Sequence, residues 1–143
     1  MVSTVRRQGG FTFLLLLWWV AVSSVVLAAL GQQWLLESRR QREIELVFRG
    51  TQIRQAIQEF YEQSPQGQDK RYPLNFDELL DDRRSGHQVR HLRRMWPDPM
   101  THRPWGVIRD GNQIKGVFST AKGKPLRAPE GVNRYADWRF EQG

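Results

Sequence analysis

An uncharged apolar run near the N-terminus limits what this chain can fold into more than any other feature. The run extends from Phe11 to Leu30, and no charged side chain occurs between Arg7 and Glu37. As a helix, these twenty residues would span about 30 Å, the thickness of the hydrocarbon core of a bilayer. We therefore predict one membrane-spanning helix. Because Arg6, Arg7 and the amino group precede it, the N-terminus is predicted to be cytoplasmic and the remaining chain exported.

Two simpler interpretations of the same segment compete with this one. A secretory signal peptide would be cut near Ala29-Leu30-Gly31, but its apolar stretch is usually only about 7 to 15 residues long. This run is longer and contains the bulky pair Trp18-Trp19. An uncleaved signal anchor is the second interpretation, and composition alone favours it.

The junction before the run carries a further signal. It reads Arg6-Arg7-Gln8-Gly9-Gly10, followed by Phe11, Thr12, Phe13, Leu14 and Leu15. This junction resembles the processing site of type IV pilins and of type II secretion pseudopilins, in which prepilin peptidase cuts after a Gly and the new N-terminal Phe is methylated. The resemblance implies cleavage between Gly10 and Phe11, and an assembly helix that starts with the residues Phe11 to Leu15. Because glycine disfavours helix, we expect Gly9-Gly10 to be extended and the helix to begin at the cut.

One position departs from the family pattern. The fifth residue of the mature chain is usually Glu, whereas Leu15 occupies that position here. A carboxylate in a bilayer is costly unless it is paired, so its presence normally signals assembly. The tip-forming minor pseudopilin also lacks this Glu, although that protein is much longer. The departure favours a minor or initiating subunit and leaves its position in the fibre, tip or shaft, open.

A second helical segment is predicted to continue from residue 32 to 63. It contains no Pro, and Gly50 is its one weak point for helix. Apolar residues recur at three-and-four spacing, which predicts a buried stripe. The stripe consists of Ile44, Val47, Phe48, Ile53, Ala56, Ile57, Phe60 and Tyr61. A coiled-coil dimer is the competing interpretation, but the stripe is short and poor in Leu.

The remaining chain predicts a short helix and a small sheet. Asn75 is a candidate N-cap with Glu78 three residues later, which predicts a helix over residues 75–82. The Asp110-Gly111-Asn112 turn predicts a hairpin between strands at about residues 105–109 and 114–120, and alternating aromatics predict a third strand at 135–140. The expected fold class is α+β and pilin-like, with one long N-terminal helix, transmembrane in its first half, packed on a small antiparallel sheet.

Positive charge is concentrated in the middle of the exported part. Residues 83–127 contain 11 Lys and Arg but only 2 Asp and Glu. A patch of five arginines near Trp96 and Trp105 has the composition of a nucleic-acid or anion site. The five are Arg83, Arg84, Arg90, Arg93 and Arg94. The alternative, which we prefer, is a solvated face that meets anionic lipid or acidic residues. The acidic residues are Asp77, Glu78, Asp81 and Asp82.

No catalytic, metal or cofactor site is predicted. His87 and His91 would share a helix face, and His102 is the third candidate ligand, but positive charge surrounds them and would repel a dication. The basic loop 119–125 lacks the carboxylates of the calcium loop found in major pseudopilins. Asp98, between two prolines, is interpreted as part of a rigid surface turn, and the pair Asp81-Asp82 as surface carboxylates. Cysteine is absent from the sequence, which excludes disulfides and thiol chemistry.

Taken with the resemblance, these observations predict a non-enzymatic structural subunit. Residues 1–10 would be the leader, 11–31 the transmembrane and assembly helix, and 32–143 the periplasmic domain. The implied partners are other pilin or pseudopilin subunits, prepilin peptidase and the inner-membrane assembly platform, with no nucleic acid. The protein would be a single-pass inner-membrane protein that joins a periplasmic fibre and drives protein secretion. The alternative is a signal-anchored inner-membrane module whose basic domain binds nucleic acid or a partner complex.

Overall fold

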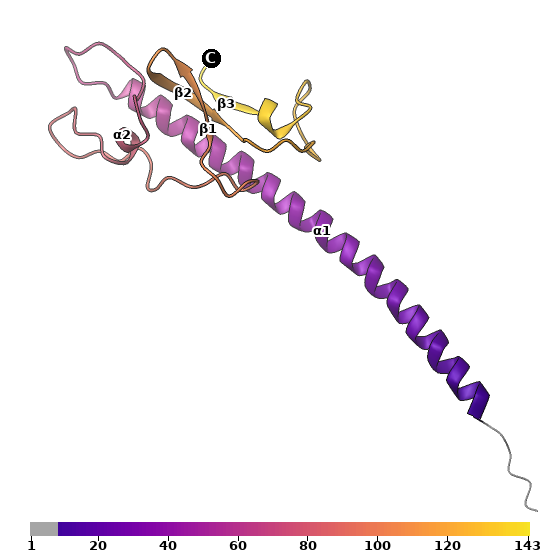
Figure 1. Cartoon of the computed structure of the whole chain (residues 1–143). Coiled ribbons are helices and arrows are strands. Elements are labelled where there is room, and N and C mark those ends of the chain that lie inside the picture. The colour runs from indigo at the N-terminus through magenta and orange to yellow at the C-terminus, as the bar shows by residue number, and fades with distance from the viewer. Residues whose placement is uncertain (1–8) are drawn as a thin grey trace, which may run out of the picture. The chain divides into compact units, whose positions relative to one another are not determined.

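The computed structural model describes residues 9–143, so most of the predicted leader lies outside it (Figure 1). The chain divides into two units, residues 1–39 and 40–143, and each is described by itself. The fold is α+β, with one long helix and a three-stranded antiparallel sheet. The elements are α1 (Gly9–Glu62), α2 (Asp77–Leu80), β1 (Gly106–Asp110), β2 (Gln113–Phe118), the 3₁₀ turn η1 (Tyr135–Asp137) and β3 (Arg139–Glu141).

The described part of the first unit, residues 9–39, is helical and belongs to α1. The helix begins at Gly9, so the expectation that Gly9 and Gly10 are extended is wrong. The first four N–H groups of any helix lack an intrahelical partner, and glycine therefore costs less in the first turn than in the interior. The helix continues from the apolar run into the second unit without a break and ends at Glu62, one residue before the predicted end.

In the second unit, the buried stripe of α1 differs from the predicted one. Ile44, Val47 and Phe48 are exposed, and the prediction that they belong to the core is wrong. The prediction is confirmed for Ile53, Ala56, Ile57 and Phe60, which are buried. The complete set of α1 residues buried at three-and-four spacing is Glu43, Leu46, Gly50, Ile53, Ala56, Ile57 and Phe60. The stripe therefore includes one charged residue and one glycine, neither of which is recognisable as core from hydrophobicity.

Gly50 is buried because the sheet approaches the helix closely there. A Cβ atom at this position would lie 2.5 Å from the ring of Phe140 on β3. The Phe140 ring also contacts Trp105 edge-to-face and stacks on Trp138, with ring centroids 6.2 and 6.0 Å apart. The apparent weak point of the helix is thus the site where an aromatic ring from the sheet fits against its backbone.

Helix α2 is shorter than the predicted helix over residues 75–82. Asn75 Oδ1 accepts a hydrogen bond from the Glu78 N–H at 3.0 Å, and the Glu78 carboxylate accepts one from the Leu74 N–H at 2.9 Å. These are the reciprocal bonds of a capping box, displaced by one residue. The helix stops at Leu80 because the backbone of Asp82 pairs with Val89 in an isolated β-bridge.

The predicted hairpin is present as β1 and β2. Gly111, at the first central position of the two-residue turn, has a φ of +58°, as a type II′ turn requires. Ile108 pairs with Gly116 and Arg109 with Ile114, which leaves Lys115 unpaired in a β-bulge. The bulge shifts by one residue the alternation of β2 side chains between the two faces of the sheet. As a result, Ile114 and Val117, three residues apart, are both fully buried.

The predicted third strand over residues 135–140 is confirmed only at residues 139 and 140. Residues Tyr135–Asp137 form η1, and only Arg139–Glu141 pair with β2. The Asp137 carboxylate accepts the Arg134 N–H at 3.1 Å, and this local bond closes a turn that competes with the sheet ladder. The turn leaves Tyr135 buried in the core.

Candidate functional site

The apolar half of α1 is the largest exposed hydrophobic surface among the described residues. It is the one helix in residues 9–143 that is long and apolar enough to cross a membrane, and none of its most apolar stretch is buried within the protein. Its two serine hydroxyl groups are satisfied internally, since Ser23 Oγ and Ser24 Oγ each donate to the carbonyl four residues earlier at 2.7 Å. This surface suits contact with lipid or with other apolar helices.

The predicted processing residues lie at the start of this helix. Nothing lies within 4 Å of a Cβ atom built on Gly10, and Phe11 is 74% exposed. The side chains of Phe13, Leu14 and Leu15 are exposed as well. The junction is therefore unobstructed by the described part of the chain.

The five arginines of the predicted patch do not form one surface. Arg83 is paired with Asp81 at 2.8 Å. Arg84 is paired with Asp82 at 2.8 Å, and it also donates to the carbonyl of Phe60 at 2.7 Å, in the last turn of α1. Arg84 thus caps the C-terminus of the helix, where a cation is favourable, and is not available as a ligand contact.

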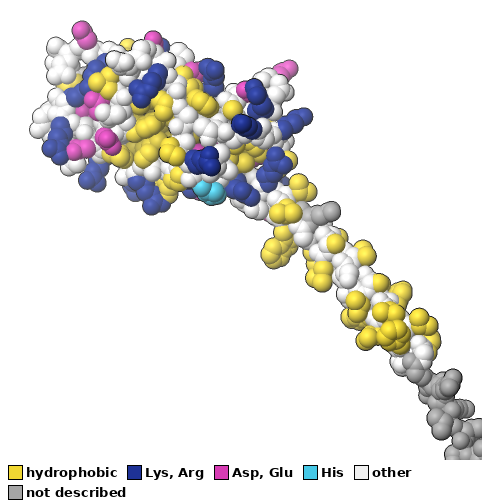
Figure 2. All heavy atoms as spheres, in the orientation of Figure 1, with side chains coloured by type: hydrophobic (Ala, Val, Ile, Leu, Met, Phe, Trp, Pro, Cys, Tyr) yellow, Lys and Arg dark blue, Asp and Glu magenta, His cyan; other side chains and the backbone are white. Residues whose placement is uncertain are grey.

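The other three arginines are exposed, namely Arg90, Arg93 and Arg94. The two tryptophans near them are not free for base stacking. Trp105 is buried, and its indole N–H donates to the Trp96 carbonyl at 2.8 Å. The Arg94 guanidinium stacks on the Trp96 ring, 3.3 Å from its centroid. Figure 2 shows that Lys and Arg side chains are spread over the visible face of the domain rather than gathered at one place.

Acidic residues pair with two of the five patch arginines, Arg83 and Arg84, and with Arg71 outside the patch. The bidentate pair between Arg71 and Glu78 has N–O distances of 2.9 and 3.0 Å. The hydrogen bonds from Arg71 lower the pKa of Glu78. For Asp82, burial by itself raises the pKa, but the hydrogen bonds from Arg84 and His91 outweigh burial and hold the pKa well below its usual range. Asp82 is buried, so the prediction that it lies on the surface is wrong.

The three histidines are not arranged as metal ligands. The segment that contains His87 and His91 is not helical, so they do not share a helix face. The His91 side chain is buried, with its Nε2 3.0 Å from Asp82, while His87 lies near Ser85 and His102 is in a different turn. No group of three or more His, Asp or Glu side chains within residues 9–143 is placed to hold a metal ion.

Asp98 is a structural centre rather than a surface turn residue. It is fully buried, which corrects the surface interpretation, although it does lie in a turn. Its carboxylate accepts hydrogen bonds from the Met100 N–H (2.9 Å), Thr101 Oγ1 (3.0 Å), Ser119 Oγ (2.7 Å) and the Thr120 N–H (3.2 Å). These bonds hold the residues after β2 and explain why the strand ends at Phe118, two residues before its predicted end.

Glu43 is a buried charged residue that the sequence did not single out. Its carboxylate accepts hydrogen bonds from the Leu126 N–H at 2.6 Å, from the Arg127 N–H at 3.2 Å and from the Tyr135 hydroxyl. It therefore fastens the loop after β2 to helix α1. Its spacing of three residues from the apolar Leu46 could have indicated that Glu43 lies on the buried face of the helix. A charged residue is not normally assigned to a core, however.

Comparison with known proteins gives no further assignment. No protein family, no curated protein and no solved structure matches this chain.

Proposed function

We propose that this protein is a membrane-anchored, pilin-like structural subunit that is cut between Gly10 and Phe11 by prepilin peptidase. One observation carries the proposal: helix α1 supplies both an exposed apolar surface and, in residues 40–62, the buried stripe of an α+β domain. A helix with these two roles suits a subunit that is stored in the membrane and packs its apolar half against other helices in a fibre.

The role would be mechanical, and no side chain in this proposal does chemistry. Leu15 lacks the carboxylate that pairs with a neighbouring amine in bulk subunits, which supports a minor subunit of a type II secretion pseudopilus or a type IV pilus. The loop after β2 is held by Glu43 through backbone N–H groups. A buried carboxylate from the helix thus fastens a basic loop in the region where major pseudopilins use calcium.

The decisive experiment is N-terminal sequencing and intact-mass measurement of the protein from native membranes, in cells with and without prepilin peptidase. A mature chain that begins at Phe11, with or without a methyl group, and that forms only with the peptidase is expected. An unprocessed chain in both strains would refute the pilin-like proposal.

A second candidate is an uncleaved anchor that carries a basic binding domain. The observation that favours it is the set of arginines after the apolar run, Arg39, Arg40, Arg42 and Arg49, which outnumber Arg6 and Arg7 before it. By the rule that basic residues stay in the cytoplasm, this count opposes export of the domain.

The side of the membrane on which the domain lies separates the two candidates. It can be measured by labelling one introduced cysteine, because the natural chain contains no cysteine. A single cysteine introduced as Lys122→Cys, in an exposed loop position, reports the location of the domain through a membrane-impermeant thiol reagent. Labelling of intact spheroplasts supports the periplasmic domain of the pilin-like proposal. Labelling only after the membrane is broken supports a cytoplasmic domain.

A further inference from the structure

A cleft of about 360 Å³ lies between α1 and the loop of residues 94–102, within the second unit. Its polar and aromatic lining consists of Arg42, Glu45 and Arg49 from the helix and Arg94, Trp96 and His102 from the loop. Three arginines and a single carboxylate give the cleft a positive charge. Neither the predicted patch nor the proposed role as a fibre subunit accounts for this arrangement.

The back of the cleft is fixed by Arg49. Its guanidinium donates to the Pro97 carbonyl at 2.8 Å, is ion-paired with Glu45, and lies over the Trp96 ring, 5.0 Å from the centroid. Arg49 therefore joins the loop to the helix, and Glu45 compensates its charge. The Trp96 ring thus contacts the Arg49 guanidinium from the helix and the Arg94 guanidinium from the loop.

The other two arginines are available to a ligand. Arg42 is exposed, and Arg94 is exposed and stacked on Trp96. No carboxylate in residues 9–143 forms an ion pair with either of them. A stacked guanidinium keeps its N–H groups free at the edge, in the planar fork that suits the oxygens of a phosphate.

The apolar run ends at Leu30, and Trp34, Leu35 and Leu36 extend the apolar chain to the edge of the charged segment. The length of chain between Leu36 and the cleft indicates where that phosphate comes from. Leu36 is the last apolar residue before the charged segment, and Arg42 follows six residues later. Even fully extended, six residues span at most about 21 Å. If the run is inserted in a bilayer, Arg42 is therefore tethered near the headgroup layer. A tryptophan beside arginines is also typical of residues at a membrane interface.

We propose that this cleft binds the phosphate headgroup of an anionic phospholipid in the leaflet where the apolar helix ends. The inference rests on the membrane insertion in the proposed function, but not on peptidase processing or fibre assembly. Bound lipid would tie the domain to the membrane surface through Arg42 and Arg94.

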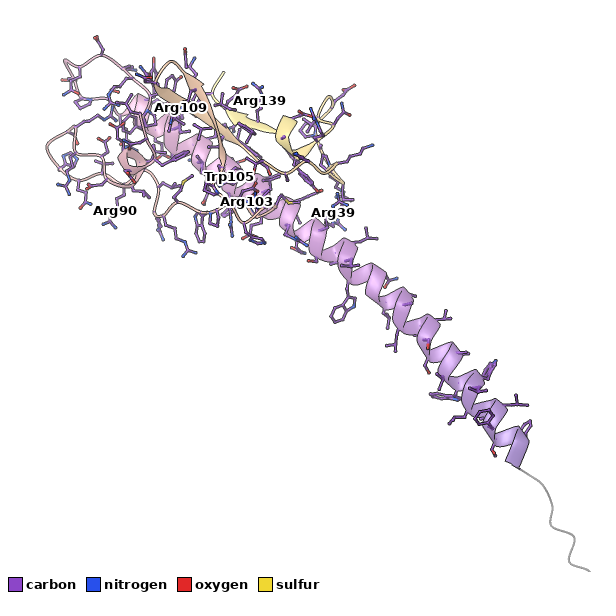
Figure 3. The ribbon with its side chains drawn as sticks, in the orientation of Figure 1. Arg39, Arg90, Arg103, Trp105, Arg109 and Arg139 are labelled. Carbon is purple, nitrogen blue, oxygen red and sulfur yellow. The ribbon has the colours of Figure 1, made fainter. Side chains whose placement is uncertain are left out.

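The test uses the full chain purified in a nonionic detergent and mixed with equal amounts of phosphatidylglycerol and phosphatidylcholine, with retained lipid counted by native mass spectrometry. The test variant is Arg42→Gln/Arg94→Gln. The matched control is Arg90→Gln/Arg139→Gln, which removes the same charge from a loop and from the outward side of β3 (Figure 3). We expect the wild type and the control to retain phosphatidylglycerol preferentially, and the test variant to lose that preference by about tenfold.

Three results would overturn the proposal. Equal retention of the two lipids by the wild type would show no anionic preference, and equal losses in both double variants would indicate general charge rather than the cleft. Displacement of the lipid by millimolar inorganic phosphate or by a single-stranded oligonucleotide would assign the arginines to a different ligand. If near-ultraviolet circular dichroism shows that the double variant is unfolded, Arg42→Gln alone, at an exposed helix position, replaces it with the same expected direction.

Failure of membrane insertion can be distinguished from failure of lipid binding by the cleft. If the wild-type chain remains in the aqueous phase without detergent, the membrane insertion is wrong and the proposed function falls with it. If the chain requires detergent but retains no anionic lipid, only the cleft proposal is refuted.

Discussion

Replacement of Gly50 by alanine tests the closest contact between the helix and the sheet. In most helix interiors, Gly→Ala stabilises a protein by about 1 kcal/mol because alanine has the higher helix propensity. Here the new Cβ atom would lie 2.5 to 2.7 Å from three ring carbons of Phe140, so that the ring must move. The ring is packed against Trp105 and Trp138, which limits where it can go.

The expected magnitude follows from these two opposing effects. Overpacking a core costs about 1 to 3 kcal/mol, and the crowded ring places this site toward the upper end. After subtraction of the propensity gain, Gly50→Ala should destabilise the second unit by about 1 to 2 kcal/mol. With a urea m-value of about 1 to 2 kcal/mol/M for a domain of this size, the unfolding midpoint should fall by roughly 1 M.

The assay is urea unfolding of the full chain in nonionic detergent, followed by near-ultraviolet circular dichroism. A double-mutant cycle with Phe140→Ala isolates the contact. In that background the ring is absent, and Gly50→Ala should become stabilising by up to about 1 kcal/mol. A Gly50→Ala protein that is more stable than the wild type, or one that is equally destabilised with and without the Phe140 ring, would refute the reasoning.

Three further predictions concern buried polar groups and the sheet. Because the Asp82 pKa is lowered in the folded state, its paired carboxylate stabilises the protein above a pH of about 4, and this stability is lost on further acidification. Asp82→Asn should remove that part of the acid sensitivity, measured by thermal unfolding from pH 2 to 6. Glu43→Ala removes the carboxylate to which the Tyr135 hydroxyl and two backbone N–H groups donate, and it should lower the unfolding midpoint by at least about 10 °C. Tyr135→Phe should cost less than half as much, and similar losses would contradict the fastening role. Gly116→Ala places a Cβ atom against the backbone of β3, and no rotamer relieves this clash. The substitution should lower the free energy of unfolding by about 2 kcal/mol and speed amide exchange in Arg139–Glu141. Unchanged exchange would contradict the close pairing.

Some parts of the fold were predictable because their signals are local. The helix from the apolar run to Glu62 follows from a long stretch without Pro, and the hairpin of β1 and β2 follows from an Asp-Gly turn between β-rich runs. The hydrogen bond from the Glu78 N–H to Asn75 was also predictable, since a capping box depends on residues three apart. Each of these features is decided by neighbours in the chain.

The candidate site was less predictable because it depends on partners far apart in sequence. The density of arginines indicated an anionic ligand, but sequence alone did not show that Arg84 caps α1 and is paired with Asp82. Nor did it bring Arg42 and Arg94 to one cleft, because 51 residues separate them in the chain. A charge count identifies a basic region, whereas tertiary contacts decide which of its charges remain available.

By itself, the sequence determined an apolar helix long enough to cross a membrane, a helical continuation and a small antiparallel hairpin. These features depend on hydrophobic periodicity and on turn residues, which act over a few neighbouring positions. The tertiary structure decided which face of the helix is buried. Hydrophobicity pointed to Ile44, Val47 and Phe48, yet the buried face contains Glu43 and Gly50. A carboxylate is stable in a core when distant donors satisfy it, and a glycine is needed where a distant ring approaches the backbone. Both requirements arise only after the sheet has docked on the helix.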